Sequence, residues 1–134
     1  MIRVGIIGTG RIFNKHQSAI SQNKLLKLVS VCDVSKKKLK KIQGNIKKFT
    51  CIDSMMIKDD LDLVSICTPS GLHAENARKV LKYKVPVLLE KPIDVNYQKA
   101  LKLVKEFRKK KVISKKPAAK VKKSTTKTVK KIIK

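Results

Sequence analysis

The chain has 134 residues, of which 42% are hydrophobic and 4% aromatic, enough apolar material for one domain with a single core. Lys and Arg total 34 against 9 Asp and Glu, so the net charge is +25. This composition excludes a collagen-like or fully disordered chain, and the short apolar runs exclude a membrane-spanning segment.

Short apolar runs rich in β-branched residues alternate with segments of helical spacing. The apolar runs predict five strands, at residues 3–7, 28–33, 49–51, 63–67 and 85–90. Helices are predicted between and after them, at residues 12–20, 35–44, 72–84 and 97–111, with a further helix of about one or two turns starting at residue 53 or 54. Since nearly continuous apolar strands joined by helices are typical of parallel sheets covered on both faces, we predict an α/β fold with a doubly wound parallel sheet of five to six strands.

Individual residues fix the expected ends of these helices. Ser35 is predicted to cap the second helix and Gly44 to end it. Asp53 or Ser54 is predicted to begin the third. The last helix carries the clearest apolar stripe in the sequence, formed by Tyr97, Ala100, Leu101, Val104 and Phe107.

The turn after the first strand has the pattern of a phosphate-binding loop. It reads Gly8-Thr9-Gly10-Arg11-Ile12-Phe13 and lies between a strand and a helix. Gly8 permits a tight turn, and Gly10 lets the backbone approach a pyrophosphate. The start of the helix adds free N–H donors and the positive end of its dipole. We therefore predict cofactor contacts at residues Gly8, Thr9, Gly10, Arg11 and Ile12.

Phe13 departs from this pattern, because a small residue is usual at its position. Its ring must either push the helix outward or point away from the turn.

Asp33 strengthens the prediction of a dinucleotide site. It ends the second predicted strand, 23 residues after Gly10, where a carboxylate can accept hydrogen bonds from the adenosine ribose. The same charge repels a 2′-phosphate, which favours NAD over NADP. The alternative interpretation is that the glycines only make a strand–helix turn and that Asp33 only caps the next helix.

Two further turns follow predicted strands at the same sheet edge, Thr68-Pro69-Ser70-Gly71-Leu72-His73 and Glu90-Lys91-Pro92. With them the chain resembles the Gfo/Idh/MocA family of nicotinamide-dependent sugar and cyclitol oxidoreductases, whose dinucleotide-binding domain is a Rossmann fold. The matching pieces are VGIIGTGRI with Asp33, SICTPSGLHAENA and VLLEKPI, and the resemblance covers residues 2–111. The TPSGLH segment is most similar to members acting on nucleotide-linked sugars, such as UDP-sugar 3-dehydrogenases.

The resemblance implies roles for the residues of these two turns. Lys91 is the implied catalytic residue, beside the nicotinamide and the substrate hydroxyl, where an ammonium group can donate a hydrogen bond to the reacting oxygen or relay its proton. Glu90 either orients Lys91 or contacts the nicotinamide side. Thr68 and Pro69 pass under the nicotinamide ribose. His73 lies near the cofactor, or else is a helix-start histidine satisfied by backbone groups.

His16, in the first predicted helix, is expected to be structural.

Residues 112–134 differ sharply from the rest, with nine Lys and no acidic residue. We predict a dinucleotide-binding domain at 1–111 and a basic, irregular tail at 112–134 that is disordered or partly helical. The resemblance also implies a second, substrate-binding α/β domain, which the sequence after residue 111 is not expected to supply. The expectation is a catalytically incomplete chain, truncated or read out of frame at its end, so that the enzyme assignment stays open.

Two rival interpretations remain. One is a polyanion or nucleic-acid binder acting through the Lys-rich tail, with affinity from counterion release. The other is an enzyme completed by a partner chain carrying the second domain; such an oligomer would use an exposed strand edge. A sugar or nucleotide-sugar substrate is expected only if that domain is supplied.

The three cysteines, Cys32, Cys51 and Cys67, each fall on a predicted strand and are expected to be small buried hydrophobes. Their odd number and spacing argue against a disulfide framework or a zinc site, and no metal is predicted. Reduced thiols and the lack of an apolar signal segment predict a cytoplasmic location.

Overall fold

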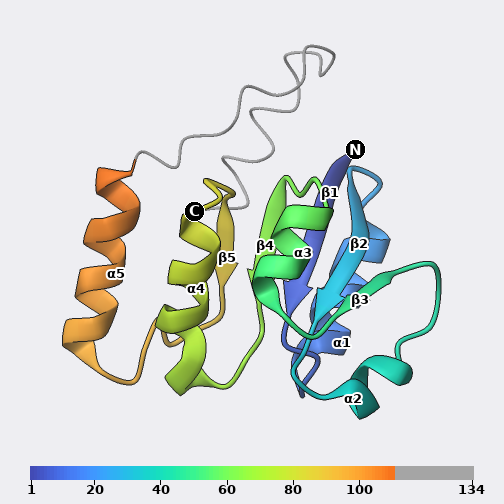
Figure 1. Ribbon diagram of the computed structural model, residues 1–134, viewed down its shortest axis with the longest axis horizontal. Coiled ribbons are helices and arrows are strands. Elements are labelled where there is room, and N and C mark those ends of the chain that lie inside the picture. Colours follow the sequence, from blue (N-terminus) through green and yellow to red (C-terminus); the bar gives the residue numbers. More distant parts are fainter. Residues whose placement is uncertain (111–134) are drawn as a thin grey trace.

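A computed structural model describes residues 1–110, so the predicted tail at 112–134 lies outside the described residues. Strands and helices alternate along the described chain (Figure 1). The strands are β1 (Ile2–Ile7), β2 (Leu26–Cys32), β3 (Lys47–Phe49), β4 (Leu63–Ile66) and β5 (Val87–Leu89). The helices are α1 (Phe13–Gln22), α2 (Lys36–Lys40), α3 (Ile52–Lys58), the 3-10 turn η1 (Ser70–Leu72), α4 (His73–Leu81) and α5 (Tyr97–Lys109).

The strands form one parallel sheet in the order β3-β2-β1-β4-β5. The chain runs outward from β1 to β3, then crosses back to β4 and runs outward to β5. All five strands end at the same edge, and the order reverses between β1 and β4, where ligands bind in open sheets of this kind. The predicted α/β class with a doubly wound parallel sheet is confirmed.

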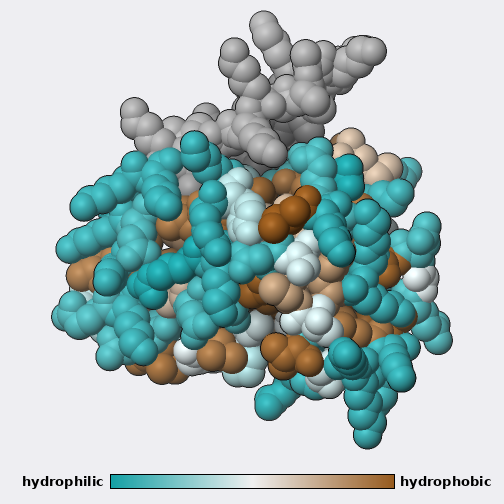
Figure 2. Space-filling view, viewed as in Figure 1, coloured by the Kyte–Doolittle hydropathy of each residue, from teal (hydrophilic) through white to brown (hydrophobic). Residues whose placement is uncertain are grey.

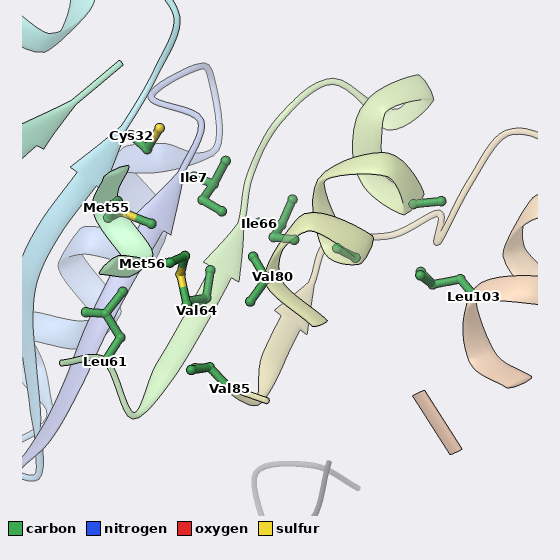
Figure 3. Close-up of a cluster of buried hydrophobic side chains, with 12 residues drawn as sticks. Ile7, Cys32, Met55, Met56, Leu61, Val64, Ile66, Val80, Val85 and Leu103 are labelled. Atoms are coloured by element: carbon green, nitrogen blue, oxygen red, sulfur yellow. The ribbon is translucent and has the colours of Figure 1, made fainter. Parts of the chain in front are cut away.

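Alternation of side chains along β1 builds a core on each face of the sheet. Val4 and Ile6 pack with Phe13 and Ile20 of α1 on one face. Ile7 faces the opposite side, in a cluster with side chains of α3 and α4. Figure 3 shows this second cluster, in which the α3 methionines fill the space above β1 and β4. Both faces of the central strands are therefore closed to water.

The third strand is displaced from its prediction, and this exposes one cysteine. β3 ends at Phe49, opposite Cys32 at the end of β2, so the chain has already left the sheet at residue 50. Cys51 precedes α3 as its N-cap and is exposed, whereas Cys32 and Cys67 are buried as expected. The prediction that Cys51 is a buried strand residue is therefore wrong, because a strand pairs only as far as its neighbour extends.

Helix ends are predicted less well than strands. Ser35 caps α2 as expected, since its hydroxyl accepts a hydrogen bond from the Lys38 N–H at 3.3 Å. However, α2 ends at Lys40, before Gly44, which lies in a turn with φ +89°. The predicted helix at 72–84 is shorter too, because η1 precedes it and α4 ends at Leu81.

The apolar stripe predicted for α5 is partly wrong. Leu103, outside the predicted stripe, is the buried residue of this helix at 3% exposure, while Tyr97 is 73% exposed. Leu103 extends from α5 toward α4 at the far end of the core cluster (Figure 3). An ion pair between Arg78 of α4 and Glu106 of α5, at 2.8 Å, fixes the same contact. Contacts with α4 thus determine which face of α5 is buried. The spacing of apolar residues within α5 does not by itself predict that face.

The surface is mostly hydrophilic, as the high lysine content requires. In Figure 2, hydrophilic side chains cover most of the visible face, with apolar side chains in small patches between them. Among residues 1–110, none of the helices has the length and apolar character needed to cross a membrane.

Candidate functional site

A cleft of about 980 Å³ lies at the edge of the sheet where β1, β2, β4 and β5 end. Its size is that of a cofactor or drug-sized ligand site. All the predicted site residues except Thr9 line it, namely Gly8, Gly10, Arg11, Ile12, Asp33, Thr68, Pro69, His73, Glu90 and Lys91. Turns that are far apart in the sequence therefore meet at one cleft.

Gly8 occupies a position that no other residue fits without strain. Its φ is +93°, and a Cβ there would lie 2.7 Å from both the Cys67 carbonyl carbon and the Thr68 nitrogen. Its N–H donates to the Cys32 carbonyl at 2.7 Å. Gly8 thus lets the end of β1 lie directly against the backbone that leaves β4.

Gly10 has a different environment, because a Cβ there would meet no atom within 4 Å. Protein packing does not require glycine at this position. Within residues 1–110, the N–H groups of Gly10, Arg11 and Ile12 donate to no protein acceptor, and no side chain caps α1. Open space, free donors and the positive end of a helix dipole together suit an anion such as a diphosphate.

Phe13, the residue that departs from the glycine-rich pattern, does not block the turn. It begins α1, is 2% exposed, and packs with Val4, Val31 and Leu39 in the core beneath. Of the two expectations for this ring, the one in which it points away from the turn is confirmed.

Asp33 is held in place by the glycine-rich turn itself. Its Oδ2 accepts hydrogen bonds from the Thr9 N–H at 2.8 Å and the Thr9 hydroxyl at 2.7 Å, and its Oδ1 accepts one from the Ser35 N–H at 2.8 Å. A carboxylate has about four acceptor positions, so about one remains for a ligand hydroxyl. Thr9 therefore contacts Asp33 and does not line the cleft, and its predicted contact with the cofactor remains a prediction.

These contacts determine the charge state of Asp33. Burial raises the pKa of this carboxyl, but hydrogen bonds from the Ser35 and Thr9 N–H groups and the Thr9 hydroxyl, together with the Lys38 charge, lower it by more. The net pKa lies below the ordinary value of 3.8. Asp33 is thus negatively charged at neutral pH, so that it accepts hydrogen bonds from hydroxyl groups and repels other anions.

The lowered pKa of Asp33 predicts acid sensitivity. A carboxyl with a depressed folded-state pKa stabilises the fold above its unfolded-state pKa, and this contribution is lost as the pH falls through the folded-state value. Urea unfolding between pH 6 and pH 2.5 should therefore show a smaller acid-induced loss of stability for Asp33→Asn than for the unmodified chain. Parallel curves for the two proteins would contradict this account.

The turn after β4 is tied down by His73 at the start of α4. The His73 ring is 2% exposed, with Nε2 2.7 Å from the Thr68 carbonyl and Nδ1 2.6 Å from the Pro92 carbonyl. Asn76 donates from Nδ2 to the Thr68 hydroxyl at 3.2 Å. Both polar atoms of the imidazole face backbone groups, as expected for a helix-start histidine of structural type; contact with a cofactor remains a prediction.

The turn after β5 brings a second histidine to the site. His16 of α1 has Nε2 2.6 Å from Glu90 Oε1 and Nδ1 2.9 Å from the Ser65 hydroxyl of β4. The adjacent Lys91 is exposed and lines the cleft, so its ammonium group is accessible to a ligand there.

The three cysteines lie in different environments that predict different reactivity. Burial raises the pKa of Cys32 to about 11, with smaller contributions from Cys51 and Asp33, and burial also raises the pKa of Cys67. In contrast, hydrogen bonds from the Ser54 N–H and hydroxyl and from the Asp53 N–H lower the pKa of the exposed Cys51.

Iodoacetamide at pH 8 should therefore alkylate Cys51 at least about tenfold faster than either buried cysteine, because the thiolate is the reactive form. Peptide mass spectrometry measures the three rates separately. In urea the rates should converge. Equal rates in the folded protein would show that the described burial is wrong.

Sequence reasoning missed two parts of this site. The contact of His16 with Glu90 escaped notice, although a polar residue on the apolar stripe of a helix indicates a buried partner. The cleft is also lined by Thr50, Cys51, Ile52 and Asp53. These residues follow β3, so the rule that placed the other turns at the carboxyl edge of the sheet applies to them as well.

Comparison with known proteins supports the same interpretation. A family model described as an oxidoreductase family with an NAD-binding Rossmann fold matches residues 2–115. The inositol 2-dehydrogenase of Rhizobium meliloti is 32% identical over 102 residues, which are 73% of this chain and 30% of that protein.

Two solved structures combine a similar fold with a bound cofactor. The WlbA dehydrogenase of Bordetella pertussis, in complex with NADH and UDP-GlcNAcA, matches with a TM-score of 0.78 and 29% identity, over 82% of this chain and 35% of that one. The scyllo-inositol dehydrogenase of Lactobacillus casei, with NAD(H) and scyllo-inositol, matches with a TM-score of 0.75 and 26% identity, over 83% and 34%. This chain thus spans about a third of the length of these relatives.

Proposed function

The chain belongs to the Gfo/Idh/MocA family of oxidoreductases and contains its NAD-binding Rossmann domain, and from this membership we propose that the cleft binds NAD(H). The diphosphate is assigned to the N–H groups of Gly10, Arg11 and Ile12, and the adenosine ribose to Asp33. The nicotinamide end is assigned to the two turns that carry Thr68, Pro69 and Glu90-Lys91.

One observation carries this assignment, namely that Gly10 has open space where a Cβ would be, beside backbone donors without acceptors. A turn that only connected a strand to a helix would have no need for this combination. The charged, partly satisfied Asp33 at the end of the neighbouring strand supplies the acceptor for the ribose. The residues present therefore fit the cofactor.

NAD rather than NADP is proposed because of the charge of Asp33. Its three hydrogen bonds hold the carboxylate at the ribose end of the cleft, where a 2′-phosphate would meet a like charge. Lys38 also lines this end of the cleft, and its positive charge would attract a 2′-phosphate. That charge already interacts with Asp33, because it lowers the pKa of the carboxyl.

Bound nicotinamide supplies the group that accepts or donates a hydride. Lys91 is proposed to act on the substrate oxygen, by donating a hydrogen bond to it or by receiving the proton that leaves the hydroxyl. Its exposed position on the cleft supports this role. The proposed substrate of the whole protein is a hydroxyl of a sugar, cyclitol or nucleotide-linked sugar, since relatives three times as long bind such compounds.

Equilibrium titration of the full chain with NADH, followed by nicotinamide fluorescence, tests the proposal. At about 0.15 M salt we expect saturable one-to-one binding, with NADPH at least about tenfold weaker. The affinity should change little at about 0.5 M salt. A signal abolished by salt and displaced equally well by inorganic tripolyphosphate would instead identify generic polyanion binding, as expected of a lysine-rich surface.

A further inference from the structure

We infer that the two histidines of the chain, His16 and His73, are positioning residues for Lys91, because each holds one of the two residues that flank it. The inference rests on the proposed function, in which Lys91 acts at the nicotinamide end of the cleft. It adds a role for two side chains that touch the site through other residues.

His16 holds the residue before Lys91. A carboxylate only accepts hydrogen bonds, so the hydrogen on His16 Nε2 points at Glu90 Oε1, 2.6 Å away. In the neutral ring, Nδ1 then accepts from the Ser65 hydroxyl at 2.9 Å. Ser65 is 1% exposed in the middle of β4, so it is a rigid anchor for the ring. The His16 ring thus connects the Glu90 side chain to a buried residue of the sheet, which restrains the position of Glu90.

His73 holds the residue after Lys91. Its Nδ1 is 2.6 Å from the Pro92 carbonyl, and its Nε2 is 2.7 Å from the Thr68 carbonyl. A carbonyl oxygen only accepts, so both contacts are hydrogen bonds when both ring nitrogens carry a hydrogen, and the ring then bridges the turn after β4 and the turn after β5, next to the cleft. Since both ring nitrogens face backbone oxygens, His73 has no polar atom left for a ligand, which separates it from residues that bind the cofactor directly.

The consequence is that Lys91 is exposed while both of its chain neighbours are held, Glu90 through its side chain and Pro92 through its carbonyl. A reacting group gains most when the residues around it are held before the ligand arrives, because less freedom is lost on binding. The two histidines come from α1 and α4, on opposite faces of the sheet. The turn after β5 is therefore contacted by one histidine from each face of the sheet.

Amide side chains can separate the two hydrogen bonds of each histidine. Asparagine places an amide near the position of Nδ1, and glutamine places one near Nε2. His16→Gln should keep the contact with Glu90, while His16→Asn keeps only that with Ser65. The pattern is reversed at the other site, where His73→Asn should keep the contact with Pro92 and His73→Gln keeps only that with Thr68.

The readout is the affinity for NADH relative to that for ADP, measured by titration of the full chain. ADP spans the diphosphate and adenosine contacts but lacks the nicotinamide, so it is insensitive to the position of Lys91. We expect His16→Asn and His73→Gln to weaken NADH at least about fivefold, with ADP changed less than about twofold. His16→Gln and His73→Asn should leave both affinities within about twofold of the unmodified chain.

Three results would overturn the inference. In the first, the NADH-to-ADP ratio is the same in all four variants. In the second, ADP affinity falls together with that for NADH, which means that the histidines only stabilise the fold; thermal unfolding of each variant identifies this case. In the third, the unmodified chain binds neither nucleotide, and the proposed function itself is then wrong. A flat ratio in a chain that binds both nucleotides contradicts only the positioning role.

Discussion

Gly8→Ala should lower the free energy of unfolding by about 3 kcal/mol or more, a large fraction of the stability of a small domain. Two costs add at this position. The φ of +93° disfavours any residue with a Cβ, and that Cβ would lie 2.7 Å from backbone atoms of Cys67 and Thr68. Backbone atoms cannot move aside as the end of a flexible side chain can, so the end of β1 must separate from the end of β4.

Urea unfolding of Gly8→Ala and Gly10→Ala side by side provides the test. Gly10→Ala is the matched control, because its Cβ would meet nothing within 4 Å. Its stability should remain within about 0.5 kcal/mol of the unmodified chain. Equal stability of the two variants would mean that β1 and β4 are not as close at this turn as described.

The second large effect is expected on binding, with Gly10→Glu weakening NADH by at least about 100-fold. The added side chain occupies the open space beside the free N–H groups, and its negative charge repels a diphosphate. The fold should be unaffected, since a Cβ at this position would meet no atom within 4 Å. Isothermal titration with NADH measures the effect.

Gly71→Glu is the matched control for this substitution. Gly71 lies in η1, also has open space at its Cβ position, and is not among the residues that line the cleft. Its neighbours Ser70 and Leu72 line the cleft, so the same charge is added beside the cleft but on a different turn from the N–H groups of residues 10–12, and NADH affinity should stay within about threefold. If both variants weaken NADH alike, the nucleotide responds to net charge rather than to the turn.

The sheet was predictable because its signal is local. Each buried strand appears as a short apolar run, and the runs at residues 3–7, 28–33, 63–67 and 85–90 correspond to β1, β2, β4 and β5. β3 was misplaced because it has a single half-buried residue, Phe49, and its length is set by pairing with β2. Leu103 was missed because the neighbour that buries it, α4, is distant in sequence.

The site was predictable in its residues but not in its internal connections. A single rule, that ligands bind where parallel strands end, brought three distant turns to one cleft. The hydrogen bonds from Thr9 to Asp33 and from His16 to Glu90 join residues 24 and 74 positions apart. Such pairings depend on side-chain directions in the folded chain, and neither spacing nor composition specifies them.

A crystal structure of the full chain grown with NADH tests the central claim most directly. We predict the diphosphate on the N–H groups of residues 10–12 and a ribose hydroxyl within hydrogen-bonding distance of Asp33, with the Thr9 contacts to that carboxylate preserved. A nucleotide bound elsewhere, on the lysine-rich surface with the turn after β1 left open, would contradict the account.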